Sequence, residues 1–319
     1  MEERYLRYRH LNMYLNEIFG ERTLKICIDG GFTCPNRDGT CGKGGCIFCG
    51  EKGSGEQLKR LPIQTQIKNH LNSYRGQRAN KFIAYFQNFT NTYDSIENLK
   101  RKYDEALSTD SRIVGLEVAT RPDCISEEIA EFLESYTNKY YVCVELGLQT
   151  SNDEIADKIN RGYKSEVFTK AVKILRNHKI NVVAHIMVGL PNEKHKDIDQ
   201  TVEFINKHDI QGIKIHSCYV IKGTELCELY EEDLYEPITF QHYIDELVYI
   251  ITHLRKDIVI HRISGDAPKD LLVAPEWNIH KRRVMAELDR RLKTEDLYQG
   301  IYVTICDNKI ARWRDTVFL

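Results

Sequence analysis

The sequence contains no long run of apolar residues. No stretch approaches the roughly 18 consecutive apolar residues that suggest a membrane-spanning helix. The N-terminal segment Met1–His10 also lacks the apolar block and the cleavage site of a secretory signal peptide. We therefore expect a protein that stays in the cytoplasm and does not span a membrane.

The chain also lacks a strong net charge, short repeats and low-complexity linkers. Its formal net charge is −2 at pH 7, so overall charge gives no indication of a nucleic-acid partner. Hydrophobic residues make up 42% of the chain and charged residues 29%, which is typical of a soluble globular protein. A length of 319 residues leaves room for two domains or for one α/β barrel.

Charge is nevertheless distributed unevenly along the chain. Residues 223–254 include eight acidic residues and no Lys or Arg. Residues 278–293 include two acids and six basic residues: Lys281, Arg282, Arg283, Arg290, Arg291 and Lys293. Such runs are usually solvated helix faces. The alternative is a patch that contacts nucleic-acid phosphates.

Short β-branched or apolar runs alternate with longer segments of helical periodicity. The strand candidates are Thr23–Asp29, Lys81–Gln87, Arg112–Ala119, Tyr140–Leu148, Ile180–Val188 and Gln211–Val220, followed by a possible seventh, Asp257–Ile263. Six βα repeats predict parallel strands, because each crossover helix returns the chain to the same edge of the sheet.

We therefore expect an α/β fold with a partial, TIM-like (βα)6 barrel. Its predicted organisation is a helical N-terminal extension (1–22), the barrel (23–265) and a C-terminal α/β extension (266–319). The C-terminal extension is expected to contain the basic helix and a last strand-like run, Ile301–Ile305.

Ten cysteines in a cytoplasmic chain are not read as a disulfide framework, because that compartment keeps thiols reduced. Four of them lie within sixteen residues, directly after the first predicted strand: Cys34, Cys41, Cys46 and Cys49. The other six are scattered and contain no CxxC pair; buried free cysteine is the simplest interpretation of them.

The cysteine-rich loop predicts a soft-metal site. Five glycines between residues 39 and 50 let the backbone fold tightly around an inorganic core. Four thiolates are able to hold structural zinc, but a zinc site normally pairs two short knuckles, and only Cys46 and Cys49 form one. The loop also follows a strand of a βα series, where a barrel enzyme carries its chemistry. Both points favour an iron–sulfur cluster over zinc.

Several short motifs make the chain resemble the radical S-adenosylmethionine (SAM) superfamily. The resemblance is to the branch that contains the Elongator catalytic subunit and coproporphyrinogen dehydrogenase, and more closely to the bacterial YtqA/YhcC family. The motifs are CPNRDGT (34–40), GGCIFC (44–49), YFQNFTNTY (85–93), TRPDC (120–124), VELGLQ (144–149), NRG (160–162), HIMVGLP (185–191), GTEL (223–226) and HRISGDAP (261–268).

This resemblance implies a [4Fe–4S] cluster held by Cys34, Cys46 and Cys49, with one iron left for the amino and carboxylate groups of SAM. Cys41 matches no ligand of the family. A minority alternative has Cys41 in place of Cys34, since either thiolate is able to serve the same iron.

The resemblance also suggests which residues hold SAM. Phe48 is expected beside the adenine, and Asn88 and Thr90 lie in the loop where relatives bind the methionine amino group. Gln149 and Arg161, twelve residues apart, match a pair that contacts SAM, with Arg161 near its carboxylate.

His185 matches a polar position near the ribose. The alternatives are that Gln149 caps a strand and that His185 is a satisfied buried histidine. Glu117 is a weaker candidate, because it lies two residues from the position where relatives carry a SAM-contacting acid.

Family resemblance alone suggests the substrate, the wobble uridine of tRNA. The expected reaction converts a 5-carboxymethylaminomethyl group to 5-aminomethyl, with flavodoxin or ferredoxin as electron donor. Two alternatives remain: a radical SAM oxidoreductase that acts on a small metabolite or tetrapyrrole, and a zinc-stapled RNA-binding module without catalysis.

Overall fold

A computed structural model describes residues 7–53, 58 and 60–303. Seven parallel strands form one curled sheet in the order β1-β2-β3-β4-β5-β6-β8, and a two-stranded ribbon pairs β7 with β9. The strands are β1 (Thr23–Ile28), β2 (Lys81–Phe86), β3 (Ile113–Thr120), β4 (Tyr141–Gln149), β5 (Asn181–Val188), β6 (Gly212–Ser217), β7 (Val220–Ile221), β8 (Val259–Arg262) and β9 (Leu272–Ala274).

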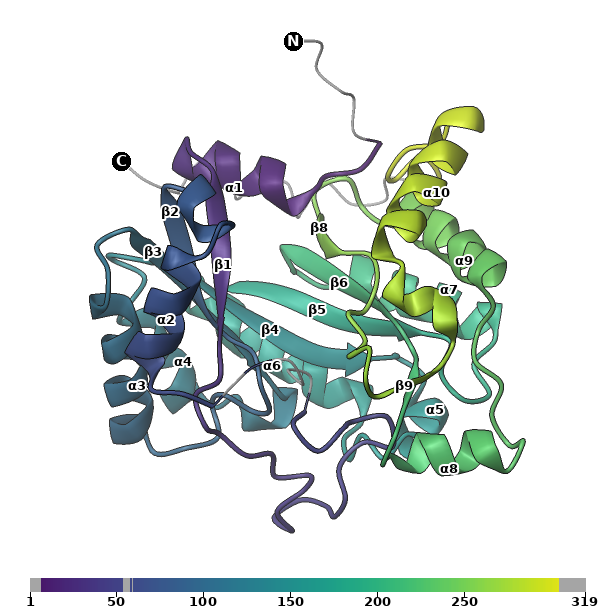
Figure 1. The fold of residues 1–319 in the computed structure, drawn as a ribbon, viewed down its shortest axis with the longest axis horizontal. Helices are drawn as coiled ribbons and strands as arrows, with labels where there is room; N and C mark the ends of the chain where they lie inside the picture. The colour runs from purple at the N-terminus through teal and green to yellow at the C-terminus, as the bar shows by residue number, and fades with distance from the viewer. Residues whose placement is uncertain (1–6, 54–57, 59, 304–319) are drawn as a thin grey trace.

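Helices cover the outer face of this sheet (Figure 1). The helices are α1 (Leu11–Phe19), α2 (Ile63–Asn72), α3 (Ile96–Ser108), α4 (Glu127–Glu134), α5 (Asp153–Lys158), α6 (Ser165–Asn177), α7 (His195–Asn206), α8 (Glu225–Glu231), α9 (Phe240–His253) and α10 (Lys281–Thr294). Amphipathic helices pack their apolar faces on the strands and so form the main core. None of the helices described here is long and apolar enough to cross a membrane.

The predicted half-barrel is confirmed, including its seventh strand. The expected strand Gln211–Val220 is wrong in one respect, because the chain leaves the sheet at Cys218 and continues as β7. Cys218 N still donates to Val188 O at 2.8 Å, but Val220 pairs antiparallel with Ala274. Residues 301–303 form no strand, and the rest of the expected run Ile301–Ile305 lies outside the described residues. The division at residues 22 and 265 stays a prediction.

The inner face of the barrel is layered. At the N-terminal ends of the strands, Leu15 of α1 packs with Ile83, Tyr141, Cys143 and Val183 and closes the barrel with apolar side chains. The next layer contains charged side chains, and the loop that follows β1 lies beyond the C-terminal ends of the strands (Figure 1). This arrangement places the cysteine loop at the end of the barrel where parallel-sheet enzymes carry their chemistry.

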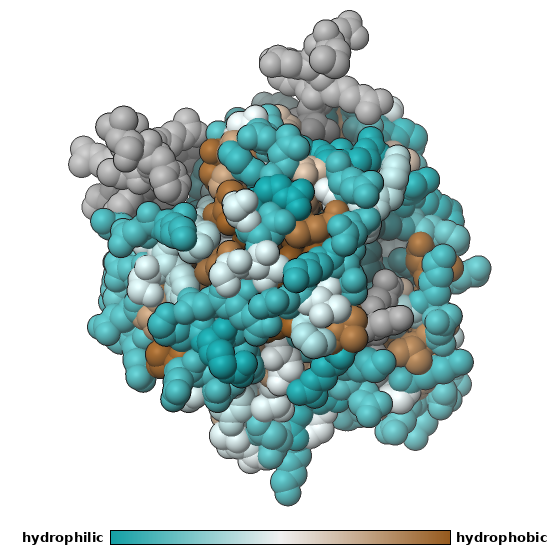
Figure 2. Space-filling model, turned by 60° about the vertical axis from the view of Figure 1, so that its left-hand side comes forward, coloured by the Kyte–Doolittle hydropathy of each residue, from teal (hydrophilic) through white to brown (hydrophobic). Residues whose placement is uncertain are grey.

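The face shown in Figure 2 is mainly hydrophilic, and its apolar side chains gather in small groups between polar ones. Helix α10 packs on α9 through Val284, Leu288 and Leu292, which lie at helical spacing and are buried. At the margin of this contact, Arg283 lies over the Phe240 ring and Arg291 pairs with Asp245, both residues of α9.

Candidate cofactor site at the mouth of the barrel

Tight turns give the cysteine loop its shape. Cys34 O accepts hydrogen bonds from Arg37 N at 2.8 Å and from Asp38 N at 3.1 Å, and Cys41 N donates to Pro35 O at 2.8 Å. Cys49 N donates to Cys46 O at 2.9 Å, which folds the CxxC segment into a single turn. These turns bring residues that are far from one another in an extended chain into one small region.

The NRG segment after α5 holds the cysteine loop from the other side. Asn160 adopts a positive φ of 52°, and its Nδ2 donates to Gly45 O at 2.7 Å and Lys43 O at 3.2 Å. In return, Asn36 Nδ2 donates to Asn160 O at 2.7 Å and lies 3.8 Å from Cys46 Sγ. The loop after β1 is thus fastened to the loop after β4 by two reciprocal amide side chains.

The four thiols differ in exposure. Cys34, Cys46 and Cys49 are partly exposed, whereas Cys41 is exposed. Burial raises the pKa of the Cys46 thiol to about 11; the nearby Arg121 guanidinium opposes this, and the neighbouring Cys34 thiol adds to it. Thiols that interact with one another beside a guanidinium suit a cluster, because a cluster requires thiolates and a nearby cation stabilises them.

Two buried side-chain oxygen atoms in the loop after β2 have no hydrogen-bond partner among the described residues. The side chains of Asn88 and Thr90 are each 1% exposed, and neither Asn88 Oδ1 nor Thr90 Oγ1 has a hydrogen-bond partner within the described parts of the chain. Asn88 Nδ2 donates to Asp29 Oδ2 at 3.2 Å, and Thr90 N donates to Thr33 O at 3.1 Å. Buried polar atoms normally have partners, so these two oxygens fit a ligand that donates, such as an ammonium group.

Phe48 supplies an apolar surface at the same end of the barrel. It is partly buried and packs against a second core cluster that includes Ile47, Ile159, Leu190 and Leu226. Ile47 N donates to Ile159 O at 3.2 Å, and Leu226 N donates to Ile47 O at 2.9 Å. These bonds fix the backbone of Ile47, directly before Phe48.

Arg161 is buried, with 1% of its surface exposed, and most of its guanidinium N–H groups donate hydrogen bonds within the protein. Its guanidinium donates to Leu148 O, to Thr150 O at 2.6 Å, to Tyr163 O at 2.9 Å and to Asp153 Oδ1 at 3.2 Å. These bonds leave one N–H of Nη2 without a partner among the described residues. Arg161 therefore organises the end of β4.

Gln149 ends β4 with a positive φ of 57°, and its Oε1 accepts from Tyr163 OH at 3.4 Å. His185 lies deeper in the barrel, where its Nε2 is 2.9 Å from Glu145 Oε2. This contact agrees with the alternative of a satisfied histidine, and it leads to a set of charged residues that the motifs do not indicate.

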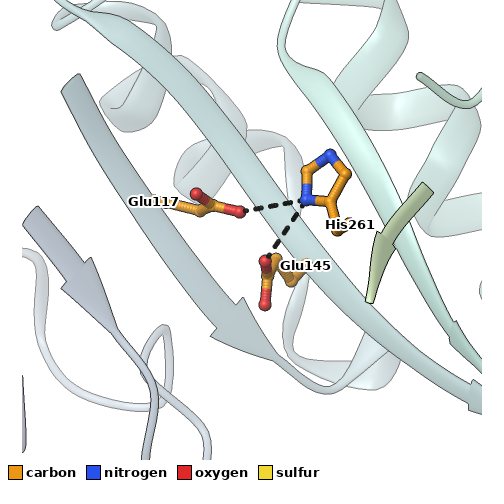
Figure 3. A group of neighbouring side chains, drawn as sticks. All are labelled: Glu117, Glu145 and His261. Carbon is orange, nitrogen blue, oxygen red and sulfur yellow. Dashed lines mark ion pairs between the residues drawn. The ribbon is translucent and has the colours of Figure 1, made fainter. Parts of the chain in front are cut away.

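One polar side chain from each strand of the barrel points into the charged layer. They are Lys25 (β1), Tyr85 (β2), Glu117 (β3), Glu145 (β4), His185 (β5), Lys214 (β6) and His261 (β8). Glu117 and Glu145 are fully buried, and Figure 3 shows them with His261 around one point. A detectable signal in the sequence is the lone charged residue at an inward position of an apolar strand, as in Thr23–Ile28 and Gly212–Ser217.

Comparison with known proteins decides the family. The radical SAM superfamily model matches residues 36–205, more than half of the chain, and the Radical_SAM C-terminal domain model matches residues 210–294. This chain belongs to the radical SAM superfamily. As a radical SAM protein it uses a [4Fe–4S] cluster and SAM, which decides against the zinc-stapled alternative.

Relatives with similar sequences confirm the expected branch. The protein YtqA of Bacillus subtilis is 37% identical over 299 residues, which cover 92% of each chain. The tRNA uridine(34) acetyltransferase of Methanocaldococcus jannaschii is 31% identical over 170 residues, 52% of this chain and 31% of that protein. The structure of the archaeal Elp3 of Methanocaldococcus infernus has the same fold, with a TM-score of 0.65 and 19% identity over 87% of this chain and 64% of that one.

Proposed function

We propose that this radical SAM enzyme modifies the wobble uridine of tRNA by converting a 5-carboxymethylaminomethyl group to 5-aminomethyl. The observation that carries the proposal is the similarity of 170 residues to a protein named for uridine 34 of tRNA. The matched part is just over half of this chain and about a third of that protein. The fold shared with the archaeal Elp3 agrees with this relation.

Cys34, Cys46 and Cys49 would hold the cluster, since three of the four thiols of the loop are partly buried and Cys41 points into solvent. Asn88 Oδ1 and Thr90 Oγ1 would accept hydrogen bonds from the SAM amino group, because both oxygens are buried and unpartnered. Phe48 would cover the adenine with its apolar face.

Gln149, Arg161 and His185 have less direct support as SAM contacts. Arg161 has one N–H left for the SAM carboxylate, so most of its effect would come from fixing the backbone of Leu148 and Thr150 beside SAM. Gln149 lies at the same strand end. His185 would reach the ribose from the barrel interior while Glu145 orients its ring.

Held by Cys34, Cys46 and Cys49 and by the residues named above, the cluster and SAM would supply a 5′-deoxyadenosyl radical, with one electron from flavodoxin or ferredoxin. The protein orients SAM, excludes water and exposes one C–H bond of the substrate. The CH2 between nitrogen and carboxylate is the C–H group that would give up a hydrogen atom, since both neighbours would stabilise the remaining unpaired electron. A one-electron acceptor, oxidised ferredoxin or flavodoxin, then removes an electron, and loss of the N–H proton forms an imine. Addition of water releases the aminomethyl group and glyoxylate, which balances the reaction.

The N-terminal end of α10 would contact the tRNA backbone. Ile279, His280, Lys281, Arg282 and Arg283 line an open hollow of about 620 Å³. Arg282 is exposed and has no acidic partner within the described chain, and Arg283 stacks over the Phe240 ring at 4.3 Å. Three basic side chains at one helix end suit phosphate contacts, which weaken as salt rises.

The test is nucleoside analysis of tRNA incubated with the anaerobically reconstituted enzyme, SAM and a reductant. We expect loss of 5-carboxymethylaminomethyluridine and an equal gain of 5-aminomethyluridine with wild-type protein, and no change with Cys46→Ala. In parallel, tRNA from a deletion strain should accumulate the substrate nucleoside. Unaltered tRNA in both experiments would reject the proposal in favour of a small-molecule substrate.

A further inference from the structure

The charged layer of the barrel contains its own internal cation. Lys25 Nζ lies 2.5 Å from Glu117 Oε1, 3.1 Å from Glu145 Oε1 and 3.2 Å from His261 Nδ1. These are the three side chains that Figure 3 shows around one point, at a spacing that a metal ion would also accept. The Lys25 ammonium already fills that point, so the group needs no metal.

Both carboxylate oxygens of Glu145 have hydrogen-bond partners. Its Oε2 accepts from Lys214 Nζ at 2.5 Å and from Tyr85 OH at 2.5 Å, and it lies 2.9 Å from His185 Nε2. Lys214 Nζ also donates to Tyr85 OH at 3.1 Å. Two lysines therefore face two carboxylates in this layer; both oxygens of Glu145 are bonded, whereas Glu117 Oε2 is buried without a partner among the described residues.

His216 lies next to this layer and has no hydrogen-bond partner among the described residues. It follows Lys214 by two residues on β6, so both side chains are on the inner face, with His216 nearer the mouth of the barrel. Its ring lies 5.3 Å from the His185 ring, no hydrogen bond to another described residue is formed, and its Nε2 is buried and unpartnered.

The surroundings of His216 are electropositive. Burial and the nearby His185, Arg262 and Lys214 hold the pKa of His216 well below its usual range, so the ring is neutral and carries one N–H donor. Burial also raises the pKa of Glu117 to about 8, against the effect of Lys25, so a proton largely neutralises Glu117 near neutral pH. The layer then contains more positive than negative charge.

We propose that His216 donates a hydrogen bond to a carboxylate of the substrate, in an anion subsite of the barrel interior whose positive potential comes from Lys25 and Lys214, since Asp266 already pairs with Arg262 at 2.9 Å. This inference rests on the proposed function, in which the reacting group is a carboxymethylaminomethyl side chain. A terminal carboxylate on a slim side chain is able to enter the barrel, whereas a backbone phosphate, linked to the chain on both sides, remains at its mouth. Binding of the carboxylate beside His216 would hold the adjacent CH2 toward the cofactor end of the barrel.

The experiment compares two anticodon stem-loops that differ only in the wobble side chain, carboxymethylaminomethyl or aminomethyl. Their dissociation constants are measured by fluorescence anisotropy with the reconstituted holoenzyme and SAM, without reductant. Wild-type protein should prefer the carboxylate-bearing RNA by at least about tenfold, the usual effect of one hydrogen bond to a charged group. His216→Ala should abolish this preference, and His216→Gln, which keeps an N–H donor, should restore part of it.

The matched control is His208→Ala, since His208 contacts Thr169 on the outside of the barrel. It should keep the wild-type preference. Wild-type discrimination that survives in His216→Ala, with cluster content and SAM binding intact, would overturn the subsite.

Nucleoside conversion by the wild-type enzyme is measured separately and tests only the proposed reaction, independently of the subsite. Conversion without discrimination rejects the subsite and keeps the function. Discrimination through His216 without conversion rejects the function and keeps the subsite. Absence of both rejects both.

Discussion

Individual thiols of the cysteine loop differ more in their surroundings than their spacing suggests. Cys46 lies beside Asn36 and interacts with the Cys34 thiol and the Arg121 guanidinium. Cys41 is exposed, and its backbone N–H is taken up by Pro35 O. Burial next to a cation favours a ligand, whereas exposure favours a thiol that is free to react with solvent components.

Replacement of single cysteines by alanine should separate these roles. Cys34→Ala, Cys46→Ala and Cys49→Ala should each lose most of the roughly four irons of the reconstituted protein and all SAM cleavage, because an incomplete set of thiolates does not hold the cubane. Cys41→Ala should keep both. Iron and sulfide analysis together with anaerobic absorbance spectra provide the measurement. Loss of the cluster in Cys41→Ala with retention in Cys34→Ala would reverse the assignment of these two residues.

Helix α10 divides into two electrostatic halves. In its C-terminal half, Arg290 pairs with Glu287 at 2.6 Å, Arg291 pairs with Asp245 at 2.8 Å, and Lys293 pairs with Asp289 at 2.7 Å. In the N-terminal half, Arg282 has no such partner in the described chain. The basic run that looks uniform in the sequence therefore offers free positive charge mainly at one end.

Charge reversal at the two ends should affect tRNA binding differently. Arg282→Glu with Arg283→Glu should raise the dissociation constant of tRNA and reduce the slope of log K against log salt by about one to two, as expected for one or two lost phosphate contacts. The matched pair Arg290→Glu with Arg291→Glu should have a smaller effect on tRNA binding, since acidic side chains already form ion pairs with Arg290 and Arg291. A salt titration of tRNA binding tests both. Equal effects of the two double variants would show that the ion pairs of Arg290 and Arg291 do not reduce their contribution to tRNA binding.

At the scale of the whole molecule, buried charged side chains lie inside the barrel, between the apolar layer at its N-terminal end and the cofactor site at its mouth. Side chains from seven strands form one network, and the pKa values of its two carboxyl groups are shifted in opposite directions. Burial, reinforced by Glu145 and opposed by Lys25, raises the pKa of Glu117 to about 8, whereas Lys214 and Lys25 hold the pKa of Glu145 well below its usual range despite its burial. Removal of one partner from such a network leaves a buried charge unpaired, at a cost of about 3–5 kcal/mol.

The raised pKa of Glu117 predicts how stability depends on pH. A carboxyl whose pKa is higher in the folded state contributes stability that is present below its unfolded value, near 4.5, and is lost as pH rises through about 8. The wild-type protein should therefore lose unfolding free energy relative to Glu117→Gln between pH 5 and pH 8.5. Glu193, whose pKa burial also raises to about 8, is present in both proteins and cancels in the comparison.

Thermal unfolding of both holoproteins at several pH values provides the measurement, with Glu203→Gln on the surface of α7 as a control. Parallel curves for wild type and Glu117→Gln would contradict a shifted pKa at Glu117.

Local signals in the sequence predicted most of the fold. Short β-branched or apolar runs and intervening helical periodicity place β1 to β6 and β8 within a few residues of their observed bounds, because strands of a parallel sheet that are buried on both faces are almost continuously apolar. The break at Cys218 was missed, since the residues on both sides are equally suited to a strand. The cysteine spacing and the neighbouring motifs likewise identified the family, which the comparisons confirm.

By itself, the sequence determined the element order, the cysteine loop and the family, since these depend on residues that are close in the chain. Only the tertiary structure decided which polar residues meet. Lys25 and His261 are 236 positions apart, yet they close the charged layer across the edge strands, because the stagger of a curled sheet brings them together. The same stagger places His216 beside His185 and fastens Asn36 to Asn160, contacts that depend on strand register, which residue spacing does not encode.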